Sequence, residues 1–180
     1  MPYGEQFDEI DCVTALEFIQ PDRVLNINIK NPALESVNFL KKSGLELCEN
    51  TLGNIKARER MKIQYAIANS LQGIVVGTGQ AAEMLTGFFT KGGDGVSDIS
   101  PIACLNKRQG RSLLKTLNCP KSLYLKVPTA DLETLKPGRP DEEILGISYE
   151  KIDDYLEGKV LSSENIAKIE KLFLSTQHKR

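Results

Sequence analysis

The 180-residue sequence contains one histidine, no tryptophan and no pair of cysteines in a Cys-x-x-Cys spacing. Its cysteines, Cys12, Cys48, Cys104 and Cys119, stand far apart, and its histidine is His178. Zinc sites in proteins are built from clusters of Cys and His, so this sequence does not predict one. We expect the four thiols to be reduced, as they are in a cytoplasmic protein.

The sequence also lacks a charge excess and a long apolar run. Lys and Arg number 23 against 24 Asp and Glu, a formal net charge of -1. No basic field therefore predicts nucleic acid or an anionic membrane as a partner. No apolar run approaches the roughly 20 residues that cross a bilayer, and residues 1–12 lack the basic and apolar regions of a signal peptide. We expect a soluble, cytoplasmic chain that binds neither nucleic acid nor membrane.

The residues that are present favour one α/β domain over 1–180. Hydrophobic residues make up 41% of the chain, enough for the core of one compact domain. Amphipathic periodicity, capping residues and Gly or Pro stops predict helices, and short apolar or alternating runs predict strands. The predicted helices are 8–19, 32–44, 53–73, 79–90, 105–117, 149–156 and 164–174, and the predicted strands are 23–30 and 74–78. Their alternation predicts a parallel sheet flanked by helices, with a long loop over 126–146.

Polar side chains gather just after the second predicted strand, in residues 77–101. Ligands of parallel sheets bind beyond the carboxyl ends of the strands, where Thr78 lies. Glu83 is a candidate ligand for Mg²⁺, although a helix dipole alone also favours an acid in a first turn. Lys91, Asp94 and Asp98 fit either a binding loop or ordinary turn chemistry.

Several motifs resemble those of one known family. The run "GTGQAAEMLTGFFTKGGDGVSDISPIACLNKRQGRSLL" follows "GNIKARERM" and precedes "LKVPTADL" and "DEEILGISYEKIDDYLEG". The chain closes with "QHKR". Their order and spacing resemble the ammonia-dependent NAD synthetases over nearly the whole chain.

This resemblance implies a ligase of NAD biosynthesis. ATP would adenylate the nicotinate carboxylate of deamido-NAD, pyrophosphate would leave, and ammonia would displace AMP to give NAD. The implied fold is adenine nucleotide α-hydrolase-like, of the ATP pyrophosphatase type, and the implied assembly is a homodimer with deamido-NAD at the subunit interface. Nothing in the sequence resembles a glutaminase domain, so free ammonia is the expected nitrogen donor.

The resemblance also assigns roles to individual residues, none of them a catalytic nucleophile. It implies Mg²⁺ binding by Glu83, ATP binding by Thr78, Lys107 and Thr129, and deamido-NAD binding by Arg58, Lys91, Asp98, His178 and Lys179. Apart from the resemblance, Arg58 and Lys107 also fit solvated helix faces, and His178 also fits a disordered tail.

One motif of that family, a Ser-Gly-Gly-x-Asp-Ser phosphate loop after the first strand, has no counterpart here. Such a loop holds pyrophosphate with backbone N–H groups, and its Asp supplies a carboxylate to the metal. We therefore expect an N-terminally truncated chain, the C-terminal two thirds of a synthetase, without the first strand and the loop. Two alternatives stay open. A second polypeptide supplies the loop, or the chain is a non-catalytic relative that binds nucleotide or dimerises with a full-length or complementary chain.

Related ATP pyrophosphatase ligases use the same Gly-rich loop and do not predict "GFFTKGGDG" together with "LGISYEKID". They are the weaker enzyme alternative.

Overall fold

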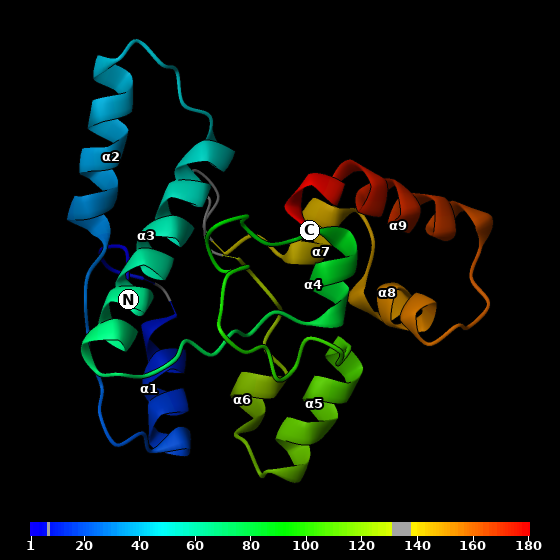
Figure 1. Ribbon diagram of the computed structural model, residues 1–180. Coiled ribbons are helices and arrows are strands. Elements are labelled where there is room, and N and C mark those ends of the chain that lie inside the picture. The colour runs from blue at the N-terminus through cyan, green and yellow to red at the C-terminus, as the bar shows by residue number, and fades with distance from the viewer. Residues whose placement is uncertain (7, 131–137) are drawn as a thin grey trace.

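The computed structural model describes residues 1–6, 8–130 and 138–180 (Figure 1). These residues form the helices α1 (Glu9–Ile19), α2 (Lys30–Lys42), α3 (Glu49–Ser70), α4 (Ala81–Thr86), α5 (Lys107–Thr116), α6 (Lys121–Tyr124), α7 (Asp141–Leu145), α8 (Tyr149–Leu156) and α9 (Ser163–Ser175), and the short 3-10 helix η1 (Gln177–Lys179). Within the described ranges, none of these helices has the length and apolar character that crossing a membrane requires.

The helices form two groups joined by irregular segments (Figure 1). On one side α2 packs along α3; α1 lies on the same side and contacts α6, the helix beside α5. On the other side α4 packs against α8 and α9, and α5 contacts both α6 and α8. The segment between α4 and α5 returns through the middle of the molecule. Within the motif-rich stretch 77–101, α4 thus belongs to the second group, and the irregular residues after it lie between the two groups of helices.

Most helices begin and end near their predicted positions. The helix predicted over 149–156 is confirmed as α8, while α3 begins at Glu49, four residues before the prediction. The helix predicted over 79–90 is shorter than expected, because α4 ends at Thr86 and Gly87 follows in the left-handed region with φ +67°. Part of the predicted loop 126–146 is helical, since α7 begins directly after Pro140.

The predicted parallel sheet is not confirmed. In the part of the chain that the structure describes, β pairing is limited to two isolated bridges, a parallel one between Val76 and Ile99 and an antiparallel one between Thr129 and Pro140. Strands become regular when neighbouring strands satisfy their backbone N–H and C=O groups. The predicted strands 23–30 and 74–78 lack such neighbours on most of their length.

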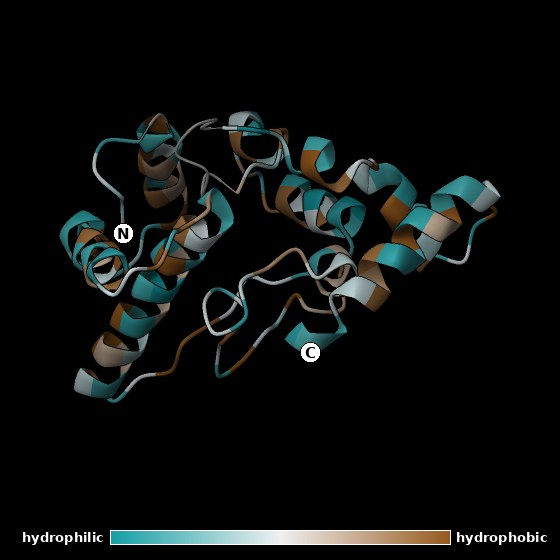
Figure 2. Cartoon of the chain, turned by 90° about the horizontal axis from the view of Figure 1, so that it is seen from above, coloured by the Kyte–Doolittle hydropathy of each residue, from teal (hydrophilic) through white to brown (hydrophobic). Residues whose placement is uncertain are grey.

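Several apolar side chains of these two segments are open to solvent, although Ile29 and Val75 are buried. Val24 is 53% exposed, Ile74 61% and Val76 55%. In Figure 2 a brown, hydrophobic stretch leaves the end of α3 and runs across the molecule as an irregular segment. These segments have the composition of buried strands, but only part of their apolar surface is buried.

The main core joins α4, α7, α8 and α9. Its buried members are Ala82, Leu145, Ile147, Tyr149, Ile152 and Ile169. Ile152 and Ile169 are fully buried, so the contact between α8 and α9 is dry and closely packed. Because Ala82 belongs to this core, the short helix α4 is fixed on its inner face, and its other face is turned toward the cavity described next.

Candidate functional site

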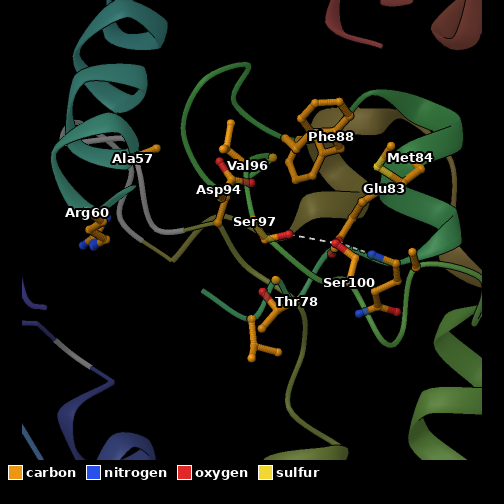
Figure 3. Close-up of a pocket in the computed structure, with 18 of the residues that line it drawn as sticks. Ala57, Arg60, Thr78, Glu83, Met84, Phe88, Asp94, Val96, Ser97 and Ser100 are labelled. Carbon is orange, nitrogen blue, oxygen red and sulfur yellow. Dashed lines mark hydrogen bonds between the residues drawn. The ribbon is translucent and has the colours of Figure 1, made fainter. Parts of the chain in front are cut away.

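A cavity of about 540 Å³ opens between α3, α4 and the irregular segments 75–80 and 94–100. Figure 3 shows Ala57 and Arg60 of α3 on one side of it and Glu83 and Phe88 on the other, with Asp94 between them. Thr129, Ala130 and Asp141 complete its lining. A smaller hollow of about 320 Å³ shares Glu83, Thr129 and Asp141 with the cavity and adds Lys107 and Lys126. The polar groups of three distant chain segments therefore meet here.

Local capping fixes Glu83 at the start of α4. Its Oε2 accepts a hydrogen bond from the backbone N–H of Gln80 at 3.1 Å, and the Gln80 side chain completes a capping box. Its Oε1 lies 2.8 Å from Nζ of Lys107. The two side chains are only 21% and 15% exposed, so this ion pair is partly shielded from solvent.

The backbone of Lys107 is held by α8. Asp153 accepts hydrogen bonds from the N–H groups of Lys107, at 3.2 Å, and Arg108, at 2.8 Å. Asp153 is 2% exposed, and its negative charge suits the N-terminus of α5. Asn106 satisfies a further amide there, that of Gln109, at 2.8 Å. The start of α5 is thus rigidly placed, while the side chain of Lys107 reaches into the smaller hollow.

Tyr149 and Asp141 lie beneath the ammonium group of Lys107. Nζ of Lys107 stands 4.5 Å from the centre of the Tyr149 ring, within cation–π range. The Tyr149 hydroxyl donates a hydrogen bond to Oδ2 of Asp141 at 2.9 Å. Burial raises the pKa of Asp141, and the Tyr149 hydrogen bond and the charge of Lys107 act in the opposite direction. Burial likewise raises the pKa of Tyr149, so this phenol stays protonated and keeps its role as donor.

The structure therefore brings together four of the predicted residues, Thr78, Glu83, Lys107 and Thr129, around the cavity and its smaller neighbour. Reasoning from the sequence did not single out Asp141 or Tyr149. Both stand in the motif "DEEILGISYEKIDDYLEG", which carried no residue assignments. Asp141 and Tyr149 stand eight residues apart in the sequence, and only the fold shows that their side chains are in contact.

The five residues predicted to bind deamido-NAD do not line the main cavity. Arg58 donates to the carbonyl oxygen of Lys91 from Nε at 3.2 Å and from Nη2 at 3.1 Å. The Lys91 ammonium in turn donates to the carbonyl oxygen of His178. Arg58, Lys91 and His178 thus form one chain of contacts.

Asp98 and Lys179 have other partners. Oδ2 of Asp98 accepts from the backbone N–H of Val75 at 2.7 Å. The Lys179 ammonium donates to the carbonyl oxygens of Gly87, at 2.7 Å, and Phe89, at 2.8 Å. Burial lowers the pKa of Lys179. In this structure the Asp98 and Lys179 side chains both form hydrogen bonds with backbone groups of the chain.

Within the described residues no group of three or more Asp, Glu, His or Cys side chains is arranged to hold a metal ion. Mg²⁺ in nucleotide sites is commonly bound by one or two carboxylates and by substrate phosphates. Glu83 and Asp141, which share both hollows, fit that smaller requirement.

The fold and this site define a largely helical protein with a polar pocket between its helices, and the family follows from comparison with known proteins. The family model described as NAD synthase matches residues 1–180, and the chain belongs to this family. It is 57% identical over 180 residues to the NH(3)-dependent NAD(+) synthetase of Cronobacter sakazakii, covering 100% of this chain and 66% of that protein. It is 58% identical to the corresponding synthetase of Buchnera aphidicola subsp. Schizaphis graminum, of which it covers 67%. The chain thus spans about two thirds of the length of these relatives.

Solved structures agree with the family fold. The NAD+ synthetase of Burkholderia pseudomallei superposes with a TM-score of 0.79 at 44% identity, over 99% of this chain and 66% of that one. The NMN synthetase of Francisella tularensis superposes with a TM-score of 0.85 at 35% identity, over 96% of this chain and 70% of that one.

Proposed function

We propose that this chain serves the ATP-dependent amidation of deamido-NAD by ammonia, which yields NAD, AMP and pyrophosphate. The observation that carries the proposal is the meeting of Thr78, Glu83, Lys107 and Thr129 around the cavity and the smaller hollow that adjoins it. The four residues come from three separate segments of the chain. Their types suit the binding of a nucleotide triphosphate, and relatives more than half identical to this chain are named NH(3)-dependent NAD(+) synthetases.

In this proposal Thr78 and Thr129 bind ATP through their hydroxyl groups, and Lys107 neutralises its phosphates. The flexible stem of Lys107 suits that role, because its ammonium can follow the phosphates while α5 stays fixed. No protein nucleophile is required. The chain would accelerate the reaction by holding the carboxylate of deamido-NAD near the α-phosphate and by offsetting the charge that develops there.

We propose Glu83 as the protein ligand of Mg²⁺. The metal would supply charge neutralisation at the phosphates when bound. The chain would contribute the Glu83 carboxylate, which the capping box at the start of α4 already holds in place. Oε2 already accepts the Gln80 amide hydrogen bond, and Oε1 is the oxygen turned toward Lys107.

For deamido-NAD we propose Arg58, Lys91, Asp98, His178 and Lys179, at the interface of a homodimer. The cationic members now donate to backbone carbonyl oxygens. Binding would exchange these carbonyl acceptors for anionic or hydroxyl acceptors of the substrate, which form stronger hydrogen bonds with a charged donor. A cytoplasmic location, with the four cysteines as free thiols, belongs to the same proposal.

A second candidate function rests on the uncovered apolar segments. Val24, Ile74 and Val76 are each more than half exposed, although their sequences predict strands. A chain that associates with a complementary polypeptide would bury them and would gain phosphate-binding backbone amides from that polypeptide. We propose this association as the alternative to activity of the chain alone.

One assay separates these possibilities. The purified chain is incubated with ATP, Mg²⁺, deamido-NAD and ammonium, and NAD is followed by enzymatic cycling, with Glu83→Ala as the control. NAD formation that Glu83→Ala abolishes supports activity of this chain. NAD that forms only after adding the part of the Cronobacter relative that this chain does not match supports the alternative. No NAD in either case contradicts the proposal.

Replacing deamido-NAD by nicotinate mononucleotide in the same assay tests substrate choice, since one structural neighbour is named an NMN synthetase. We expect deamido-NAD to be preferred, in keeping with the names of the relatives that are 57% and 58% identical to this chain. Equal or faster conversion of the mononucleotide would contradict this choice of substrate.

A further inference from the structure

The ammonium group of Lys107 already lies where a cation would neutralise the Glu83 carboxylate. Its Nζ is 2.8 Å from Oε1 of Glu83 and 4.5 Å from the centre of the Tyr149 ring. Both ends of the ion pair are mostly shielded from solvent. Breaking such a pair leaves an uncompensated carboxylate unless another cation takes its place.

Asp141 supplies a second carboxylate to the same place. The residue is 5% exposed and lines both hollows together with Glu83. Its Oδ2 accepts the Tyr149 hydroxyl hydrogen bond, whereas its buried Oδ1 accepts no hydrogen bond of regular geometry among the described residues, although the Ala130 amide lies near enough to lower the pKa of the carboxyl. A buried acceptor without a partner is unfavourable, and a bound cation would relieve it.

The three charged groups also act on one another. The charge of Lys107 lowers the pKa of Asp141, and the charge of Glu83 raises it, besides the larger effect of burial. Two carboxylates close enough to interact in this way favour a bound cation. At present the Lys107 ammonium is ion-paired with Glu83 and acts on Asp141 only through its charge.

We propose that Glu83 and Asp141 are the two protein ligands of a divalent-cation site, and that Lys107 occupies this site as a resident cation which the metal ion must displace. The proposal deepens the proposed function, on which it rests, by adding Asp141 and by giving Lys107 a role before nucleotide binds. Displacement would free the Lys107 ammonium to meet phosphate oxygens. Arrival of the metal would thus be coupled to the availability of the lysine, while the Asp153 cap keeps α5 in place.

The test uses Mn²⁺ alone as the probe, with the full 180-residue chain and no nucleotide. Binding is measured by electron paramagnetic resonance of the free ion. We expect Lys107→Met to raise Mn²⁺ affinity by about tenfold, because the metal no longer has to break the ion pair with Glu83. We expect Glu83→Gln and Asp141→Asn each to lower it by about tenfold, since each removes one charged ligand.

Matched controls remove the same charges elsewhere. Lys115→Met changes the net charge equally on the same helix α5, and Glu150→Gln does so on α8; both residues are exposed. They should leave Mn²⁺ binding unchanged. Circular dichroism checks that each variant is folded, and Lys107→Gln replaces Lys107→Met if the latter does not fold.

The outcomes are distinct. Equal or weaker Mn²⁺ binding by both uncharged Lys107 variants would overturn the resident-cation role. Unchanged binding by Asp141→Asn, with a loss in Glu83→Gln, would overturn the second ligand. Because the readout is metal binding, a failure to form NAD would contradict the proposed function and leave this site standing.

Discussion

The Arg180 guanidinium donates two hydrogen bonds to the carbonyl oxygen of Met84, at 2.9 Å from Nε and 2.6 Å from Nη2. A third goes to the carbonyl oxygen of Leu85 at 2.7 Å. These are carbonyls of the last turn of α4, which have no partners within the helix. A cation at that end is also favoured by the helix dipole. Residues at the end of the chain therefore close the helix whose beginning carries Glu83.

We predict that Arg180→Ala destabilises the fold modestly and loosens α4. The loss of charged hydrogen bonds from a partly exposed side chain should cost about 1 kcal/mol, or roughly 2–4 °C in the midpoint of thermal unfolding. Hydrogen exchange at the amides of Phe88 and Gly87, which bond to the Glu83 carbonyl, should become faster. Lys171→Ala, an exposed change on α9, is the control. Equal exchange in the two variants would contradict this capping role.

Gly87, directly after α4, tests a neighbouring contact, its close approach to the Thr176 side chain. A Cβ atom on Gly87 would lie 2.3 Å from the Thr176 side chain, whereas one on Gly146 would meet nothing within 4 Å. Both glycines have φ +67°, so the backbone strain of an alanine, about 1–2 kcal/mol, is shared. We predict that Gly87→Ala is more destabilising than Gly146→Ala by a further 1 kcal/mol or more, roughly the cost of overpacking. Urea unfolding of both variants measures the difference, and equal midpoints would contradict the close approach of Thr176.

Stability should depend on pH through Asp141. Burial raises the pKa of this carboxyl in the folded chain, so its favourable contribution is fully present below the unfolded pKa and is lost as pH rises through the raised folded pKa. An asparagine keeps an acceptor for Tyr149 and has no such loss. We predict that Asp141→Asn gains stability relative to the parent chain between pH 4 and pH 7.

Urea unfolding at pH 4, 5, 6 and 7 checks this prediction, with Glu150→Gln as a control at an exposed site. A constant difference between Asp141→Asn and the parent chain over this range would show that the carboxyl is not perturbed by burial.

Helices could be predicted from the sequence because their signals are local. Ser148 caps α8 as its position before the predicted helix 149–156 indicates, whereas α9 is capped by Ser162, one residue earlier than the predicted start at 164 implies. The early end of α4 was missed because "GFFTK" continues the helical pattern, and only the left-handed Gly87 and its contact with Thr176 end the helix there. Long-range partners of this kind have no local signal.

The prediction of the sheet was wrong, and that of the site incomplete, because both depend on long-range partners. Apolar runs such as 74–78 predict strands, yet a ladder needs partners that the described residues do not provide. Thr78, Glu83, Lys107 and Thr129 are predicted by their family-like motifs, and they lie around the cavity and the smaller hollow beside it. Asp141 and Tyr149 were not, because their contact depends on how α7 and α8 pack.

The last prediction concerns the apolar hollow beside α3. Leu25, Ile63, Ile67 and Leu71 line this hollow, and Leu71 is 56% exposed. Exposed apolar surface of this kind binds hydrophobic dyes and other chains. We predict that the parent chain binds the dye ANS, and that Leu71→Lys reduces this fluorescence and any self-association seen by sedimentation. Val160→Lys is the control, because Val160 is fully exposed and belongs to no hollow described here.

The same hollow discriminates between the two proposed functions. If a complementary polypeptide covers it, adding the unmatched part of the Cronobacter relative should lower the ANS signal of the parent chain, and Leu71→Lys should weaken that association. The reason is that a buried lysine must lose its hydration, or break the contact, where a leucine would gain from burial. An unchanged ANS signal on addition, together with NAD formation by the chain alone, would leave activity of the single chain as the function that the site supports.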